Sequence, residues 1–421
     1  MKLHKSDVVL AGLGQGLGFL GTIIGLKVLT NLLAVEEYGK LSLVMAIAGI
    51  VGLFTFGPLG QIVVRFYSVC KERICLNDYK NKLFEIYLQS IIFIVSASFI
   101  VCGIIFFLSP QWLIPIALGI MFSVIYGVFG GAHSLLLTTN IRKEYNIILG
   151  LEPWVRLGMA VAFIIGVSAS SNFVLLGYIV GSFIIFLYVL AVIKDKVDFG
   201  IDKNINNTDL RKEMISYGSP FLFFALFASI SQYGDRWIIN SFWSLEEVGL
   251  FAVKYQIASA PIMLVMAILT QLIMPRVFHK AGDYRSGRSF NDADKMIYIN
   301  MLLMIAIFAF ISGVFYFYGN ILIILLTSNK YLDGENNIWL FVVGIGLFNI
   351  AQFLITSGLA RNKSKVYLKP KIIHALVSFI TGLVLIPNFG VQGAVYAILL
   401  SSIFYLTYVI SISFIFMREQ K

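Results

Sequence analysis

The chain has 421 residues, of which 59% are hydrophobic and only 13% are charged, and its mean hydropathy is +0.87. About a quarter of the residues of a soluble domain are charged, so this composition excludes a soluble globular protein and predicts an integral membrane protein. The net charge of +10 does not indicate nucleic-acid binding, because the distribution of the basic residues follows a membrane topology, as shown below.

The first predicted element is an apolar run over residues 8–34, which contains the stretch GLGQGLGFLG. Its spacing matches the G-x-G-x-x-G dinucleotide fingerprint, but that motif needs a preceding strand, and the few residues before the run leave no room for one. In a membrane, small residues four positions apart allow helices to approach closely. The glycines therefore predict close packing, which is compatible with a first helix that bends during a transport cycle. The run is too long for a signal peptide and is expected to be a retained span.

Twelve runs are long enough to cross a bilayer as a helix, which takes about 20 apolar residues. Together they predict an all-α integral membrane protein. The runs are 8–34, 40–66, 84–108, 113–138, 147–168, 172–193, 215–241, 248–275, 297–326, 337–360, 369–386 and 391–416.

Basic residues are concentrated on one side of these spans. Counted in alternate segments from the N-terminus, 26 of the 32 Lys and Arg residues fall in one set, and the opposite set holds Lys40 and Lys330 only. Because cytoplasmic loops carry the excess of Lys and Arg, both termini are expected to be cytoplasmic. The three cysteines have no metal-binding spacing and suggest no disulfide framework, and no cofactor is expected.

The two halves of the chain share a short repeat. Glu36-Glu37-Tyr38-Gly39 follows the first span and Glu246-Glu247-Val248-Gly249 follows the seventh. Internal repeats are common in secondary transporters. The repeat predicts an N-terminal six-helix lobe over 1–200, a cytoplasmic linker over 201–214 and a C-terminal six-helix lobe over 215–421, with a substrate path between the lobes.

Ionisable residues inside spans are costly and indicate functional sites by default. In the seventh span Ser229, Gln232, Tyr233, Arg236 and Asn240 form a polar stripe at the helical period, whereas Asp235 points away from Arg236. Further polar residues inside spans are Lys27 and Asn31 in the first, Lys254 in the eighth, and Asn349, Gln352 and Thr356 in the tenth. We expect a water-filled cavity with positive charge, which suits an anionic ligand.

Structural explanations remain open for several of these residues. Lys27 and Lys254, and to a lesser extent Arg236, lie near predicted span ends, from which a long side chain can extend to the membrane surface. Arg156 follows Glu152 by four residues, the favourable order for an intrahelical pair, so a self-neutralised pair competes with a substrate contact. Asp235 has either a coupling role or a structural one.

Two stretches resemble a known family. The stretch TNLLAVEEYGKLSLVMAIAGIVGLFTFGPLGQIVVRF (Thr30 to Phe66) resembles the start of Wzx-type polysaccharide flippases, and YGDRWIINSFWSLEEVGLFAVKYQIA (Tyr233 to Ala258) resembles their seventh and eighth spans. Phe251 replaces the usual Tyr of the family's V-G-x-Y motif. The resemblance extends over essentially the whole chain and implies the multidrug/oligosaccharidyl-lipid/polysaccharide exporter superfamily, with a MATE-like fold.

That resemblance implies a flippase rather than an enzyme. Its substrate would be an undecaprenyl-pyrophosphate-linked oligosaccharide, an O-antigen or similar repeat unit, carried from the cytoplasmic to the periplasmic leaflet of the bacterial inner membrane by alternating access. Lys27, Arg236 and Lys254 become candidates for binding the pyrophosphate or acidic sugars. The full set of predicted substrate-binding residues is Lys27, Asn31, Arg156, Gln232, Arg236, Asn240 and Lys254. A polymerase and a chain-length regulator of the same pathway are candidate partners.

Three other functions fit the sequence less well. A cation-coupled multidrug exporter of the same fold needs buried acidic residues, whereas this chain offers mostly basic ones inside its spans. A membrane polysaccharide polymerase needs catalytic groups at an aqueous face, and the short outer connections hold few. A scaffold without transport activity does not explain the polar stripes.

Overall fold

The computed structural model describes residues 5–200, 208–281, 290–332, 337–361 and 363–418. Every regular element in these ranges is a helix, which confirms the predicted all-α fold. Part of the expected linker, 201–207, lies outside the described residues.

Eleven helical stretches of the described chain are long and apolar enough to cross a membrane. The last, in α15 (Leu368–Arg418), is interrupted at Gly390, where φ is 57° and ψ is −134°. A Cβ on Gly393 would overlap the carbonyl oxygen of Leu385. Residues eight apart in one continuous helix lie about 12 Å apart along its axis, so the chain turns back on itself here. The expected spans 369–386 and 391–416 are therefore the two arms of α15, and the protein is a multi-pass membrane protein.

Contacts divide the chain into two compact units. Unit 1 comprises residues 1–25 and 40–229, and unit 2 comprises residues 26–39 and 230–421. The division passes through three helices, α1 (Lys5–Leu32), α2 (Val35–Val51) and α9 (Pro220–Phe242). The lobes predicted from the sequence, 1–200 and 215–421, have different boundaries from these units and remain a prediction.

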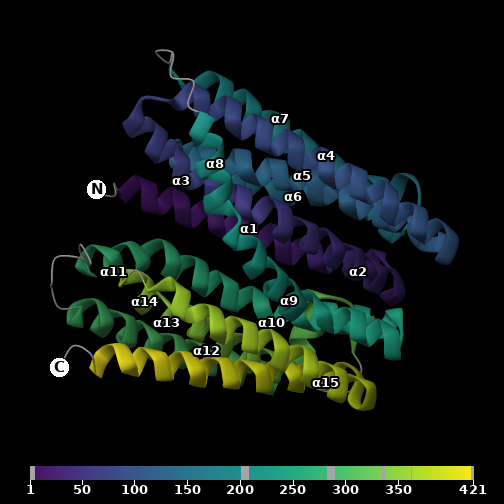
Figure 1. Cartoon of the computed structure of the whole chain (residues 1–421). Coiled ribbons are helices and arrows are strands. Elements are labelled where there is room, and N and C mark those ends of the chain that lie inside the picture. Colours follow the sequence, from purple (N-terminus) through teal and green to yellow (C-terminus); the bar gives the residue numbers. More distant parts are fainter. Residues whose placement is uncertain (1–4, 201–207, 282–289, 333–336, 362, 419–421) are drawn as a thin grey trace. The chain divides into compact units, whose positions relative to one another are not determined.

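Unit 1 contains a bundle in which α6 packs on α7 and α7 on α5, while α3, α4 and α8 pack on one another (Figure 1). A π-helical turn separates α2 from α3. Unit 1 also contains parts of α1 and α9 and the part of α2 (Val35–Val51) that begins at Lys40. Its other elements are η1 (Gly52–Phe56), α3 (Gly57–Arg73), α4 (Leu76–Leu108), η2 (Pro110–Trp112), α5 (Leu113–Thr138), α6 (Arg142–Gly166), α7 (Ser171–Lys196) and α8 (Thr208–Gly218).

Unit 2 is built around α13, which packs against α10, α12 and α15. Phe341 and Phe353 of α13 are buried there. Besides its parts of α1, α2 and α9, its elements are α10 (Leu245–Leu272), α11 (Met274–Ala281), α12 (Asn291–Leu326), η3 (Asn329–Tyr331), α13 (Ile338–Leu354), α14 (Thr356–Ala360), η4 (Ser364–Tyr367) and α15.

The glycine-rich face of α1 packs closely on α6 within unit 1. A Cβ on Gly14 would lie 2.6 Å from the carbonyl oxygen of Asn146, and one on Gly18 would lie 2.9 Å from that of Leu149. The Trp154 indole of α6 also donates a 3.0 Å hydrogen bond to the Leu17 carbonyl. The Gly14/Gly18 pair thus has the packing role that the sequence predicted. The Gly12/Gly16 pair, on another face of α1, does not have this packing role, since a Cβ on either glycine would meet nothing within 4 Å.

The repeated turns meet inside unit 2. The first turn of α2 begins at Val35 and that of α10 at Leu245, and these positions differ by the same 210 residues as the two motifs. Glu36 and Glu37 occupy the first turn of α2, as Glu246 and Glu247 do that of α10. Acidic residues at a helix N-terminus interact favourably with the helix dipole, so the repeated Glu-Glu pairs have a local structural explanation.

Candidate functional site

Arg156 is held between aromatic rings in unit 1. Its guanidinium carbon lies 5.4 Å from the ring centre of Tyr126 on α5 and 5.1 Å from that of Tyr178 on α7. Both distances are within the range of a cation–π interaction. The helix packing fixes this geometry, because a Cβ on Gly181 of α7 would lie 2.7 Å from the Arg156 Cα. The three central helices of unit 1 therefore converge on one guanidinium.

Glu152 provides the counter-charge one turn earlier on α6. Arg156 Nε lies 3.1 Å from Glu152 Oε1, and the two side chains are 21% and 9% exposed. The ion pair that the sequence left open is therefore formed. Arg156 presents five donors, and an intrahelical pair through Nε does not occupy the terminal nitrogens. The pair and a substrate contact are thus compatible in this geometry.

Arg236 has a similar environment in unit 2. Its guanidinium carbon lies 5.7, 5.5 and 5.4 Å from the ring centres of Tyr233, Phe251 and Tyr255. Arg236 Nη1 also donates a 2.8 Å hydrogen bond to the Gln232 carbonyl one turn earlier. Phe251, the position where the sequence departs from the family motif, supplies one of these rings. Each unit thus contains one arginine in a predicted span, surrounded by aromatic rings.

Asp235 and Lys254 are the other charged residues predicted at this end of unit 2, and both are buried, at 5% and 2% exposure. Asp235 faces α15, since a Cβ on Gly382 would lie 3.5 Å from its Oδ1, whereas Arg236 lies against the aromatic residues of α10. The divergence of these neighbours agrees with the helical geometry, in which positions i and i+1 do not share a face.

Lys27 and Asn31 lie at the C-terminal end of α1, within unit 2. Lys27 Nζ donates to the Ile324 carbonyl at 2.7 Å and to the Thr327 carbonyl, at the end of α12. Lys330, just beyond α12, in turn donates to the Asn31 carbonyl at 3.2 Å. Lys27 of α1 thus caps the C-terminus of α12, and Lys330, in η3 (Asn329–Tyr331), caps that of α1; a cation is favoured at both positions. No pattern in the sequence predicts this exchange of caps.

The remaining predicted polar residues differ in exposure. Gln232 and Asn31 are exposed and Asn240 is half-buried. Asn349 is buried and donates a 2.8 Å hydrogen bond to the Ile345 carbonyl of its own helix, so its polarity is satisfied locally. The Gln232 carbonyl contributes to the Arg236 environment, whereas Asn349 does not need a water-filled cavity.

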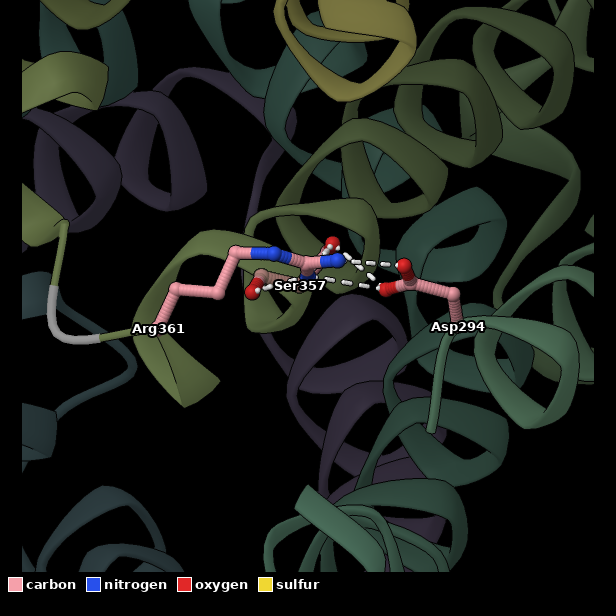
Figure 2. Close-up of polar contacts among 3 residues, drawn as sticks. All are labelled: Asp294, Ser357 and Arg361. Atoms are coloured by element: carbon pink, nitrogen blue, oxygen red, sulfur yellow. Dashed lines mark hydrogen bonds and ion pairs between the residues drawn. The ribbon is translucent and has the colours of Figure 1, made fainter. Parts of the chain in front are cut away.

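A buried cluster that the sequence analysis missed joins α12 to α14 (Figure 2). Arg361 Nη1 donates to Asp294 Oδ1 at 2.9 Å and to Ser357 Oγ at 2.7 Å, and Nη2 donates to Asp294 Oδ2. Ser357 Oγ donates to Asp294 Oδ1 at 2.8 Å. The Arg361 and Asp294 side chains are only 6% and 7% exposed, and the guanidinium carbon lies 4.6 Å from the Phe290 ring centre.

This cluster has no sequence signal of its own. Arg361 was counted as one of the loop cations that set the topology, and Asp294 lies 67 positions away in a charged stretch. Ser357 lies four residues before Arg361 on the same helical face, which is a weak indication at most. Because both charges are paired and hydrogen-bonded, the cluster is expected to hold the start of α12 against α14 rather than to bind a ligand.

Solved structures define the class of protein to which this fold belongs. The chain is similar to the lipid II flippase MurJ in an inward closed conformation, at 15% identity over 96% of this chain and 87% of that chain, with a TM-score of 0.68. It is also similar to a multidrug resistance MATE family transporter of the MOP superfamily in an inward-facing conformation (12% identity, 98% and 96% covered, TM-score 0.64). A MOP superfamily transporter from Pyrococcus furiosus matches too (12%, 97% and 94%, TM-score 0.59). At these identities the likeness shows a shared fold.

Residues 5–280 match the family of polysaccharide biosynthesis proteins. The chain therefore belongs to that family, as the resemblance of its two quoted stretches predicted. The comparison with curated proteins finds no match.

Proposed function

We propose that this protein is a flippase that carries undecaprenyl-pyrophosphate-linked oligosaccharide units across the membrane. The observation that supports this most directly is that each unit contains an arginine in a predicted span, surrounded by aromatic rings. Guanidinium groups bind phosphate oxygens through two parallel donors. Aromatic faces offer flat apolar surfaces with a negative electrostatic face, suited to the C–H faces of sugar rings.

In the mechanism that we propose, the anionic head group gives up hydration water and gains contacts to Arg156 or Arg236. Tyr126 and Tyr178 hold the first guanidinium and Tyr255 helps to hold the second, so little side-chain entropy is lost on binding. Polar contacts to the sugars or phosphates come from Lys27, Asn31, Gln232, Asn240 and Lys254. The polyprenyl chain stays in apolar surroundings throughout, and the protein alternates between states that are open to the two leaflets.

The finer assignments belong to the same proposal. The direction, implied by the family resemblance, is from the cytoplasmic to the periplasmic leaflet of a bacterial inner membrane. The distribution of Lys and Arg predicts that both termini are in the cytoplasm. The product is O-antigen or a similar surface polysaccharide. A polymerase and a chain-length regulator would act on the unit after it is flipped.

One observation favours a second candidate, a cation-coupled multidrug exporter. Asp235 is a buried carboxylate in a predicted span, the kind of group that a cation exporter needs. The basic residues weigh against a cationic substrate. In the flippase that we propose, Asp235 has a coupling or structural role.

The experiment that tests the proposal is depletion of the protein in cells, followed by measurement of the sidedness of lipid-linked oligosaccharide. Accumulation in the cytoplasmic leaflet with loss of surface polysaccharide is the expected result. Arrival of the unit in the outer leaflet without polymerisation would favour a polymerase instead. If neither pool changed and the cells retained cationic drugs, the exporter would replace the flippase.

A further inference from the structure

Unit 1 contains a cavity of about 390 Å³ between α3, α4 and the break that separates α8 from α9. This volume is at the lower end of the range of about 300–1,000 Å³ for small-molecule sites. Apolar side chains dominate its lining, including Phe54, Ile86 and Leu222. Phe93, which also lines the cavity, is 72% exposed. None of the residues proposed for head-group binding lines it.

Two irregular helix segments form the walls of this cavity. Phe54 and Thr55 belong to the π-helical turn η1, and Ser219 lies at the break between α8 and α9. Non-helical backbone at membrane depth is tolerated where it is buried in protein or lines a cavity, and π-helical turns are frequent at functional sites. The two irregularities thus come together at one cavity, as expected for a built site rather than for a packing defect.

A basic group lies next to two of the residues that line the cavity. Arg211 precedes the lining residue Ile215 by one turn of α8, and its Nη2 donates a 2.7 Å hydrogen bond to Oε1 of the lining residue Gln89. Its Nε is buried and has no hydrogen-bond partner among the described residues. The Arg73–Glu213 ion pair, at 2.9 Å, holds α3 against α8 beside it. The arrangement combines an apolar slot with a cation at its rim.

An apolar slot with a cationic rim fits an amphiphile that has a single apolar chain and an anionic head. The predicted topology places the C-terminal end of α3 and the N-terminal end of α8 on the cytoplasmic side, where a lipid-linked precursor enters. Bilayer glycerophospholipids carry two chains, whereas a slot of this volume holds a stretch of one. The Arg211 guanidinium has five donors, of which the bond to Gln89 uses one, and guanidinium groups form strong hydrogen bonds to phosphate oxygens.

We propose that this cavity binds the first isoprene units of the lipid-linked substrate, with Arg211 against the adjoining phosphate. The inference rests on the proposed flippase function and adds a site for the lipid part of the substrate, separate from the arginine sites. Unit 1 then recognises the carrier lipid whatever sugars it bears.

The test measures binding of undecaprenyl phosphate to the full-length protein in nanodiscs, with Ser90→Trp as the variant that fills the cavity. Ser98→Trp is the matched control. Ser90 and Ser98 are both half-buried serines on α4, and each donates a hydrogen bond to the carbonyl four residues earlier. Ser98, however, does not line the cavity. Arg211→Gln is a second variant, with the exposed neighbour Lys212→Gln as its control. All variants are first checked for unchanged thermal stability.

We expect Ser90→Trp and Arg211→Gln each to weaken binding by about tenfold, as for loss of one charge-assisted contact or its equivalent, and both controls to bind like the unsubstituted protein. Excess phosphatidylglycerol should not displace the probe. Unchanged binding in both test variants overturns the proposal, and so does displacement by phosphatidylglycerol that is as effective as displacement by undecaprenyl phosphate itself. Either result does so even if depletion of the protein in cells still traps lipid-linked oligosaccharide in the cytoplasmic leaflet. If depletion leaves its sidedness unchanged, the flippase function fails and this inference with it.

Discussion

Gly39 and Gly249 contact each other's helices in a reciprocal manner within unit 2. A Cβ on Gly39 would overlap the Leu245 carbonyl oxygen, and a Cβ on Gly249 would overlap that of Val35. The two glycines are separated by 210 positions, and so are Val35 and Leu245, whose carbonyl oxygens they meet, so the two copies of the repeat pack around a local two-fold relationship. The short sequence repeat therefore corresponds to a real structural one at this crossing.

This crossing predicts a stability effect for single methyl groups. Gly39→Ala or Gly249→Ala should destabilise the protein by about 1–3 kcal/mol, because neither backbone can move away without disturbing its helix. Gly12→Ala and Gly16→Ala are the controls, since a Cβ at either position meets nothing within 4 Å and alanine favours a helix. Thermal unfolding of the purified variants measures the effect. Equal stability of all four variants would contradict the reciprocal contact.

Arg236→Ala should abolish transport while the protein still inserts into the membrane, because the guanidinium at the aromatic rings is proposed to bind the head group. Arg236→Lys should keep part of the activity, since it retains the charge but loses the planar bidentate donor. Arg276→Ala, at an exposed arginine of α11, is the control. Surface polysaccharide and the amount of protein in the membrane are measured together. Normal polysaccharide in Arg236→Ala would remove this residue from the head-group site.

The Glu152–Arg156 pair allows a counter-ion to be distinguished from a substrate contact. Arg156→Ala leaves a buried carboxylate unpaired and should cost about 3–5 kcal/mol of stability. The double variant Glu152→Ala/Arg156→Ala removes both charges and should recover most of that loss. If Arg156 binds substrate, the double variant is stable but does not transport, as measured by surface polysaccharide. Transport restored along with stability would mean that Arg156 only neutralises Glu152.

The Asp294–Ser357–Arg361 cluster should be a major source of stability in unit 2. Asp294→Asn leaves Arg361 buried without its counter-ion and should cost about 3–5 kcal/mol. Asp292→Asn, at an exposed acidic residue one half-turn away on α12, should have almost no effect. Thermal unfolding in detergent compares the two. A small and equal loss in both would show that water replaces the pair.

Substitution of Lys27 or Lys330 should reduce stability by similar amounts, because each lysine caps the C-terminus of one helix. Lys27→Met and Lys330→Met should each lower stability by about 0.3–1 kcal/mol, the usual contribution of a cation at a helix C-terminus. The two variants serve as controls for each other in a polysaccharide assay at equal protein level. If Lys27 also binds the head group, Lys27→Met alone loses transport. Equal activity would leave Lys27 with the capping role only.

The membrane class and the family can both be predicted from the amino-acid sequence. The low charge and the apolar runs of bilayer length indicate that these segments lie in lipid. They must then be helical, because only a helix or a closed barrel satisfies all its backbone hydrogen bonds there. The helical periodicity predicted that Asp235 and Arg236 face different neighbours, and the glycine spacing predicted close packing of Gly14 and Gly18. Those properties depend on residues close together in the chain.

The partners of the polar residues, in contrast, depend on how the helices pack. The pairing of Asp294 with Arg361, the exchange of caps between Lys27 and Lys330, and the rings around Arg156 all join residues of different helices. Helix periodicity fixes the face on which a side chain lies but not the helix that packs against that face. A charge in a predicted span therefore looks the same in the sequence whether it is a cap, half of an ion pair or a ligand-binding group.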